Sequence, residues 1–408
     1  MADFFQNGVI ATLHNLADRP VVEFETDLAM WGQERPMTLI IPCLASELGS
    51  PALSHIVEEL STAHYLEEVV VGLDQADRQQ FVQAQQVFSV LPQRCRVLWN
   101  DGPGLQTVTQ QVFEHLGAPI EPGKGRNVWG CLGYVLGRGQ AQVIALHDAD
   151  IATYDRSLLA RLLYPVAHPS FDYAFAKGFY ARASSDPKQL NGRVSRLYVT
   201  PLVRALAATF GRRDYLDYLE SFRYPLAGEW ALEVSVARSL RVPADWGLEI
   251  GVLSEIARSY PVNRICQVEL ADLYDHKHQD LSSEDSTAGL HRMSSDIAKA
   301  FFRKLAISGV VLTTESFRTL KAAYTREAYE LIEHYASDAA FNGFVYDRRQ
   351  EEASVDLFGQ AALQAGQDFL ESPLESPFIP SWGRLEADLP GVGAALVAAV
   401  EHDQQNFR

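Results

Sequence analysis

Residues 141–151 of this 408-residue chain read AQVIALHDADI, an apolar run that ends in two aspartates separated by one residue. A short and nearly continuous apolar run is typical of a strand buried on both faces of a sheet. Because alternate residues of an extended segment point to the same side, Asp148 and Asp150 can place both carboxylates beside one divalent cation. Asp-x-Asp also occurs by chance in loops with two solvated acids, but its position after a buried strand favours a ligand site.

Three further β-branched runs precede this strand, and segments with helical apolar spacing separate them. The runs are MTLIIP at 37–42, EEVVVGL at 67–73 and CRVLWN at 95–100. Such alternation of strands and helices indicates a mostly parallel sheet covered by helices on both faces. Ligands of these sheets bind beyond the carboxyl ends of the strands, so we expect the chemistry in the loops that follow them.

The second half of the chain changes from mixed elements to helices alone. We expect strands at DYAFAKGFYARA (172–183) and RICQVELADLYDH (264–276), helices at RLYVTPLVRALAATFG (196–211) and GEWALEVSVARSL (228–240), and a loop at ADWGLEIG (244–251). Beyond about residue 284 only helical apolar spacing remains. The predicted organisation is an N-terminal helical segment at 1–35, an α/β catalytic domain at 36–283 and a helical C-terminal extension at 284–408 for packing or dimerisation.

Composition narrows the classes of partner and compartment. The formal net charge is −17, which disfavours nucleic acid and anionic membrane surfaces as partners. An anionic substrate would therefore need lysine and arginine concentrated locally. The four cysteines form no CxxC pair, and neither a basic signal sequence nor a 20-residue apolar span is present, so we expect a cytoplasmic protein with reduced thiols.

Two further motifs have the residue types of a phosphate and metal site. In EPGKGR (121–126), glycines flank Lys124 at a predicted helix start, where a backbone can approach an anion closely, although a flexible surface loop would look the same. In Asp275-His276-Lys277-His278 the two imidazoles lie on one side of an extended segment. His276 could be a third metal ligand and His278 a substrate contact; an exposed polar strand end is the alternative.

Basic and acidic residues farther along the chain suggest contacts to an acceptor and a sugar. Arg193, in NGRVSR (191–196), stands beside a glycine and a hydroxyl, a pattern that suits a small anion or a solvated helix start. Lys177 could add positive charge there. Glu229 and Glu249 each stand near glycine and tryptophan and could bind sugar hydroxyls, with helix capping as the competing role for Glu229.

The order of these motifs, from about Thr38 to Leu305, resembles the glucosyl-3-phosphoglycerate synthases, a family of retaining GT-A glycosyltransferases. The uridine-binding Pro-Ala-Leu-Asn-Glu-Glu stretch of that family falls on residues 42–47, where Ala45 and Ser46 replace its Asn and first Glu. The resemblance implies donor contacts from Pro42, Leu44, Glu47, Asp74, Gly123, Lys124, Asp148 and Ala149. It implies metal ligation by Asp148, Asp150 and His276, acceptor contacts from Gly192, Arg193 and Ser195, and a sugar contact from Glu249. Relatives carry asparagine where this chain has His278.

This resemblance implies transfer of glucose from UDP-glucose to the 2-hydroxyl of 3-phosphoglycerate with retention, assisted by Mg²⁺ or Mn²⁺. The sequence places no second carboxylate like the nucleophile of a retaining glycosidase, so we expect a front-face route. Lys124 and the metal would stabilise the leaving diphosphate, and Arg193 would hold the acceptor in line. Catalytic roles are accordingly expected for Asp148, Asp150, Lys124, Glu229 and Glu249.

Three alternatives to this activity stay open at the level of sequence. The same fold could use mannose as the sugar or free glycerate as the acceptor. A metal-dependent hydrolase could be built on Asp148, His276 and His278. A non-catalytic nucleotide-sugar-binding protein is the third, although Lys124 and Glu249 would have no purpose in it. The expected partners are small-molecule substrates and a second copy of the chain, bound through the helical extension.

Overall fold

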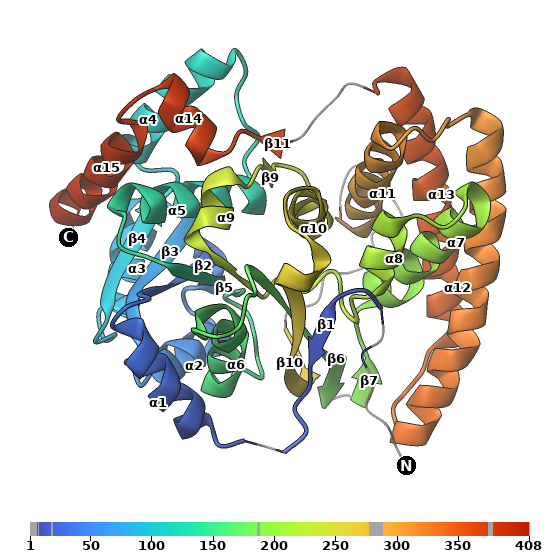
Figure 1. The fold of residues 1–408 in the computed structure, drawn as a ribbon, viewed down its shortest axis with the longest axis horizontal. Coiled ribbons are helices and arrows are strands. Elements are labelled where there is room, and N and C mark those ends of the chain that lie inside the picture. Colours follow the sequence, from blue (N-terminus) through green and yellow to red (C-terminus); the bar gives the residue numbers. More distant parts are fainter. Residues whose placement is uncertain are drawn as a thin grey trace.

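One mostly parallel sheet organises the chain (Figure 1). A computed structural model describes residues 6, 8–17, 19–185, 188–276, 289–373 and 378–407. The strand order is β1 (Ala11–Leu13), β10 (Ile265–Tyr274), β6 (Phe175–Ser185), β8 (Trp230–Glu233), β5 (Val143–Leu146), β2 (Met37–Leu44), β3 (Leu66–Asp74) and β4 (Arg94–Trp99), and β7 (Lys188–Leu190) pairs with β6. Of these, β8 runs antiparallel to β5 and β6, and β7 runs antiparallel to β6.

Successive residues of the apolar strands belong alternately to two hydrophobic clusters, one on each face of the sheet. Ile40, Val70 and Ile144 belong to one cluster, and their neighbours Leu39 and Val69 belong to the other. Helices α4 (Pro103–Leu116), α5 (Lys124–Arg138), α9 (Val234–Ser239) and α10 (Leu248–Ser259) cover the first face; α1 (Val21–Gly32), α2 (Pro51–Leu60), α3 (Arg78–Phe88) and α6 (Arg156–Ala167) cover the second. This arrangement confirms the predicted two-faced sheet and its central strands.

Two local predictions in the middle of the chain are wrong. Residues 228–240, expected to be one helix, form the short strand β8 followed by α9. Pairing with both β5 and β6 satisfies the backbone of Trp230–Glu233 in a buried position, which overrides the helical spacing. The segment 244–251, expected to be a loop, begins α10 at Leu248, with Glu249 in the first turn where an acid favours a helix.

The C-terminal extension contacts two opposite parts of the molecule (Figure 1). Helices α11 (Gly289–Ile307), α12 (Thr314–Asn342) and α13 (Arg348–Glu371) pack together beside α7 (Thr200–Phe210) and α8 (Asp214–Glu220). Helices α14 (Trp382–Asp388) and α15 (Val392–Asn406) pack instead on α4, α5 and β4. Trp382 stacks on Trp129 with ring centroids 4.4 Å apart and donates a hydrogen bond to its carbonyl oxygen.

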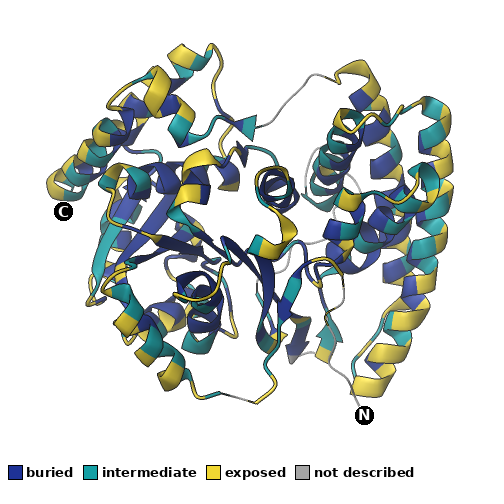
Figure 2. Cartoon of the chain, in the orientation of Figure 1, coloured by how far each residue is buried: buried dark blue, intermediate teal, exposed yellow. Residues whose placement is uncertain are grey.

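The strands of the sheet are buried, and many residues along α12 are exposed (Figure 2).

The N-terminal segment was expected to be helical. It contains α1, but it also contributes β1 to the sheet edge, since Ala11–Leu13 pair in parallel with Cys266–Val268. In the described ranges no helix is both long and apolar enough to cross a membrane.

Candidate functional site

The predicted site residues lie where the central parallel strands end. Leu44 and Asp74 are register partners at the last positions of β2 and β3. Strand β5 ends at Leu146, and Asp148 and Asp150 follow it. The strand order places β5 next to β2, so the four side chains share one edge of the sheet. This is the edge at which ligands of open α/β sheets bind.

Lys124 occupies the centre of this group. It is the first residue of α5, and its Nζ lies 2.6 Å from Asp148 Oδ1 and 3.3 Å from Glu249 Oε1. The start of α5 lies tightly against β9 (Val242–Pro243), because a β-carbon on Gly125 would be 1.8 Å from the Pro243 carbonyl oxygen. Glycine at this position therefore places the lysine between two carboxylates that come from different elements.

The charges in this group shift one another's pKa values in opposite directions. Burial alone would raise the pKa of Asp148, but the ammonium of Lys124 outweighs it and lowers that pKa below its usual range. Burial alone would lower the pKa of Lys124, but Asp148 and Glu249 raise it above its ordinary value. Burial and then the charge of Asp148 raise the pKa of Asp150 to about 7. Asp150 is thus a carboxyl group whose charge needs a nearby cation.

His276 lies beside the Asp-x-Asp segment because the two segments pair through the backbone. Ile151 and His276 form an isolated antiparallel bridge, and Ala152 N donates to the Asp275 carbonyl oxygen at 2.8 Å. His276 Nδ1 lies 3.7 Å from Asp150 Oδ2. His278 lies outside the described residues.

Within the described ranges, no three His, Cys, Asp or Glu side chains already converge as a metal cluster. At this site Lys124 contacts Asp148, and His276 Nδ1 lies 3.7 Å from Asp150 Oδ2. Two carboxylates and an imidazole are nevertheless donors that suit a divalent cation. Burial and then the charge of Asp148 disfavour the ionised form of Asp150 and raise its pKa; a bound cation would offset both effects, so the residues present fit such an ion.

Glu229 is fully buried, so in this structure it has no surface for a sugar. It precedes β8, and its carboxylate accepts hydrogen bonds from Tyr180 at 2.7 Å and Tyr274 at 2.5 Å. Burial, followed by the charge of Asp148, raises the pKa of Glu229. Because the residue precedes a strand rather than a helix, the helix-capping alternative is wrong. The two tyrosine rings stack 3.7 Å apart, a feature that sequence reasoning missed.

The expected acceptor residues are divided between the interior and the surface. Lys177 is fully buried, its ammonium donates to the Ala227 carbonyl oxygen, and burial lowers its pKa to about 8. It thus supports the loop before Glu229 instead of presenting charge to solvent. Arg193 is 27% exposed, follows Gly192 in the left-handed region, and is held by two residues of α13.

Some of the residues predicted to bind the donor are exposed, and others are buried. Pro42 and Leu44 lie in β2, with Leu44 exposed, and Glu47 is buried at the end of the 3₁₀ turn Ala45–Glu47. Asp74 is buried at the end of β3, and burial raises its pKa while Arg126 opposes the rise.

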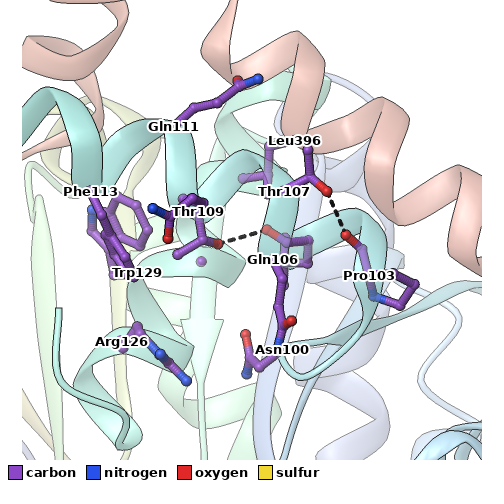
Figure 3. Close-up of a pocket in the computed structure, with 13 residues that line it drawn as sticks. Asn100, Pro103, Gln106, Thr107, Thr109, Gln111, Phe113, Arg126, Trp129 and Leu396 are labelled. Atoms are coloured by element: carbon purple, nitrogen blue, oxygen red, sulfur yellow. Dashed lines mark hydrogen bonds between the residues drawn. The ribbon is translucent and has the colours of Figure 1, made fainter. Parts of the chain in front are cut away.

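A cavity of about 690 Å³ lies between α4 and α5, beside this donor region. Arg126 and Asn100 lie at the same end of it, with Trp129 and Phe113 farther along (Figure 3). The cavity does not include Asp148, Asp150 or Glu249. Arg126 is the last residue of the EPGKGR motif, in which only Lys124 and its flanking glycines were given a role from the sequence.

No family model matches the chain. It is 44% identical over 407 residues to the glucosyl-3-phosphoglycerate synthase of Persephonella marina, with all of both chains covered. It is 37% identical over 378 residues to the glucosyl-3-phosphoglycerate synthase of Methanococcoides burtonii, with 91% of each chain covered.

A solved structure supplies the comparison of folds. Glucosyl-3-phosphoglycerate synthase from Mycobacterium tuberculosis, in complex with Mn²⁺, UDP and glucosyl-3-phosphoglycerate, matches with a TM-score of 0.53. The match covers 73% of this chain and 88% of that one at 19% sequence identity. At that identity the similarity shows a shared fold, and the expected GT-A architecture is confirmed.

Proposed function

The chain belongs to the glucosyl-3-phosphoglycerate synthase family, and from this premise we propose that it transfers glucose from UDP-glucose to the 2-hydroxyl of 3-phosphoglycerate with retention of configuration. The observation that supports this function best is the ammonium of Lys124 between Asp148 and Glu249 at the carboxyl ends of the strands. A cation held there would lie beside the diphosphate and the sugar of a donor bound at these strand ends. The complex of the tuberculosis enzyme with UDP and glucosyl-3-phosphoglycerate agrees with this chemistry.

A divalent cation, Mg²⁺ or Mn²⁺, would be held by Asp148, Asp150 and His276. When bound, it would neutralise charge that grows on the departing diphosphate. Lys124 would exchange its contact with Asp148 for one with the same diphosphate, which requires only a change of partner for a cation already in place.

The substrates would be oriented by residues of separate elements. Glu249, in the first turn of α10, would accept hydrogen bonds from the sugar. Arg193 would bind the anionic acceptor through its partly exposed guanidinium beside Gly192, and the buried Ser195 would help by holding this segment in place. Asp74 and Glu47 would bind the nucleoside, together with Pro42, Leu44, Gly123 and Ala149. Since Glu229 and Lys177 are buried, they would act by positioning the wall of the site.

Release of UDP tests this function directly. UDP-glucose and 3-phosphoglycerate are offered with Mg²⁺, and GDP-mannose, free glycerate and EDTA serve as substitutions. We expect turnover with the first pair, and loss of it with EDTA or in an Asp150→Ala variant. Turnover only with GDP-mannose or glycerate would favour the alternative sugar or acceptor. UDP release without any acceptor would favour a hydrolase, and no release at all would favour a binding protein.

The helical extension, residues 284–408, would form a homodimer interface. Several large apolar side chains are exposed on it, including Ile307, Val311, Phe341 and Val345. Ile307 and Val311 lie before the start of α12, and Phe341 and Val345 lie at its end, so a partner subunit that packs along α12 would cover them. Analytical ultracentrifugation at micromolar concentration should give the mass of a dimer, and a monomer would contradict the proposal.

We place the activity in the cytoplasm, where small phosphorylated acids and nucleotide sugars are made. The four cysteines are free thiols in the structure, three of them buried, as expected in a reducing compartment. Cell fractionation with the tagged chain in the soluble fraction would agree, and recovery outside the cytoplasm would contradict this placement.

A further inference from the structure

The segment that contains Arg193 is attached to helix α13 of the C-terminal extension. Arg193 Nε donates to Glu351 Oε1 at 2.8 Å, and Arg193 Nη2 donates to Gln350 Oε1 at 2.5 Å. In the sequence, Arg193 is 158 residues from Glu351 and 157 residues from Gln350. A helix outside the sheet-based domain thus binds the side chain proposed to hold the acceptor.

Glu351 is anchored independently of Arg193. It is only 3% exposed, and Arg196 donates to both of its oxygens, at 2.9 Å from Nη1 and 3.3 Å from Nη2. Arg196 in turn donates from Nε to the Asn191 carbonyl oxygen at 2.8 Å, and its guanidinium lies 4.7 Å from the Tyr335 ring centroid. Arg196 therefore fixes the carboxylate of Glu351, and that carboxylate can still accept a hydrogen bond from Arg193.

The backbone after Arg193 is fixed to the same helices. Ser195–Val199 forms a π-helix, a rare element that is often found at functional sites. Tyr324 of α12 donates to the Leu197 carbonyl oxygen at 2.7 Å, and Tyr198 packs against Phe358 of α13. The whole acceptor segment thus takes its position from the α12–α13 pair.

The contact leaves Arg193 able to bind an anion. An arginine carries five N–H donors, and the bonds to Glu351 and Gln350 use two of them, so three remain. Two guanidinium groups face one carboxylate, which leaves one net positive charge in the cluster. With Arg193 27% exposed, that charge is accessible to solvent.

We propose that Glu351 is a positioning residue for the acceptor: it holds the Nε side of Arg193 so that the remaining N–H groups face the phosphate or carboxylate of the acceptor. This inference rests on the proposed function, since it assumes a small phosphorylated acid as the ligand of Arg193. It assigns the helical extension a part in acceptor recognition in addition to packing. The opposite possibility is that Glu351 competes with the acceptor for the guanidinium.

Steady-state kinetics with both substrates varied separates these possibilities. We expect Glu351→Gln to raise the KM for 3-phosphoglycerate about tenfold, which is about the loss of one hydrogen bond between the guanidinium and the charged acceptor. The KM for UDP-glucose and kcat should stay within about twofold. Glu351→Asp, which keeps the charge, should restore part of the loss. Glu352→Gln is the matched control, because Glu352 is the adjacent acid and binds Arg348 instead.

Gln350→Ala tests the same contact without disturbing a buried charge, and should raise the acceptor KM about twofold to threefold. If Glu351→Gln fails to fold, this exposed position decides the outcome. An unchanged acceptor KM in Gln350→Ala and in folded Glu351→Gln would reduce the contact to a structural role and overturn the proposal. A lowered KM would also overturn it, in favour of competition. Wild-type protein inactive with this substrate pair would overturn the proposed function and this inference together.

Discussion

Replacing Gly228 with alanine should disable the site by displacing one carboxylate. Gly228 precedes Glu229 in the loop before β8, and its backbone is not in the left-handed region, so alanine is conformationally allowed. A β-carbon at this position would lie 2.4 Å from Asp148 Oδ2 and 2.9 Å from Asp148 Cγ. The glycine is thus required by the close approach of the aspartate.

The size of the effect follows from that distance. Non-bonded heavy atoms settle at about 3.5 Å or more, so the carboxylate of Asp148 must move by about 1 Å. Its 2.6 Å contact with Lys124 would then be lengthened or lost. A misplacement of this size in a catalytic group lowers the rate about a hundredfold. We therefore expect kcat/KM in Gly228→Ala to fall about a hundredfold, with a higher metal concentration needed for half-maximal rate.

The assay is UDP release at several Mg²⁺ and Mn²⁺ concentrations, with thermal unfolding followed in parallel. Gly130→Ala, within helix α5, is the matched control. A β-carbon there would have only Asn100 Oδ1 nearby, at 3.8 Å, which is an ordinary contact. The control should keep wild-type activity and gain about 0.5–1 kcal/mol of stability. Wild-type rates and metal dependence in folded Gly228→Ala would refute the importance of the position of Asp148.

Three further substitutions test other parts of the account. Lys124→Met removes the cation between Asp148 and Glu249 and should lower kcat at least a hundredfold in the UDP-release assay; a loss below tenfold would exclude Lys124 from leaving-group stabilisation. Burial lowers the pKa of Lys177 to about 8, below the ordinary value of about 10.4, so between these pH values the unfolded chain binds more protons. The urea-unfolding free energy of wild type should accordingly rise relative to Lys177→Met from pH 8 to pH 10, and a constant difference would mean that Lys177 titrates normally. Trp382→Ala removes the ring stacked on Trp129 and should cost about 3–5 kcal/mol of stability, whereas an unchanged urea midpoint would show that α14 contributes little to folding.

The central strands and the acidic site were predictable because local sequence determines both. The stretches LIIP at 39–42 and VVVGL at 69–73 are apolar without interruption, as a strand buried on two faces requires. The aspartates follow their strand directly, so knowing the strand is enough to place them at the sheet edge. The place of Lys124 was predictable in the same way, because it lies in a glycine-flanked loop at the start of a helix.

Features that depend on distant pairing were not predictable. Strand β8 has four residues, and only its two neighbours in the sheet, β5 and β6, distinguish it from a helix start. The stacked Tyr180 and Tyr274 meet because β6 and β10 are adjacent, although the residues lie in separate parts of the chain. The contact of Arg193 with Glu351 spans 158 residues, and nothing in either local sequence indicates the partner. The helical extension was accordingly expected only to pack or to dimerise.

The most direct test of the proposed reaction is the NMR spectrum of its product. UDP-glucose labelled with ¹³C in the sugar is incubated with the chain, Mg²⁺ and 3-phosphoglycerate, and the anomeric region is followed over time. The account predicts a new α-anomeric signal with a long-range coupling to C2 of the phosphoglycerate. A β-anomeric product would contradict retention, and free glucose as the main product would contradict glucosyl transfer itself.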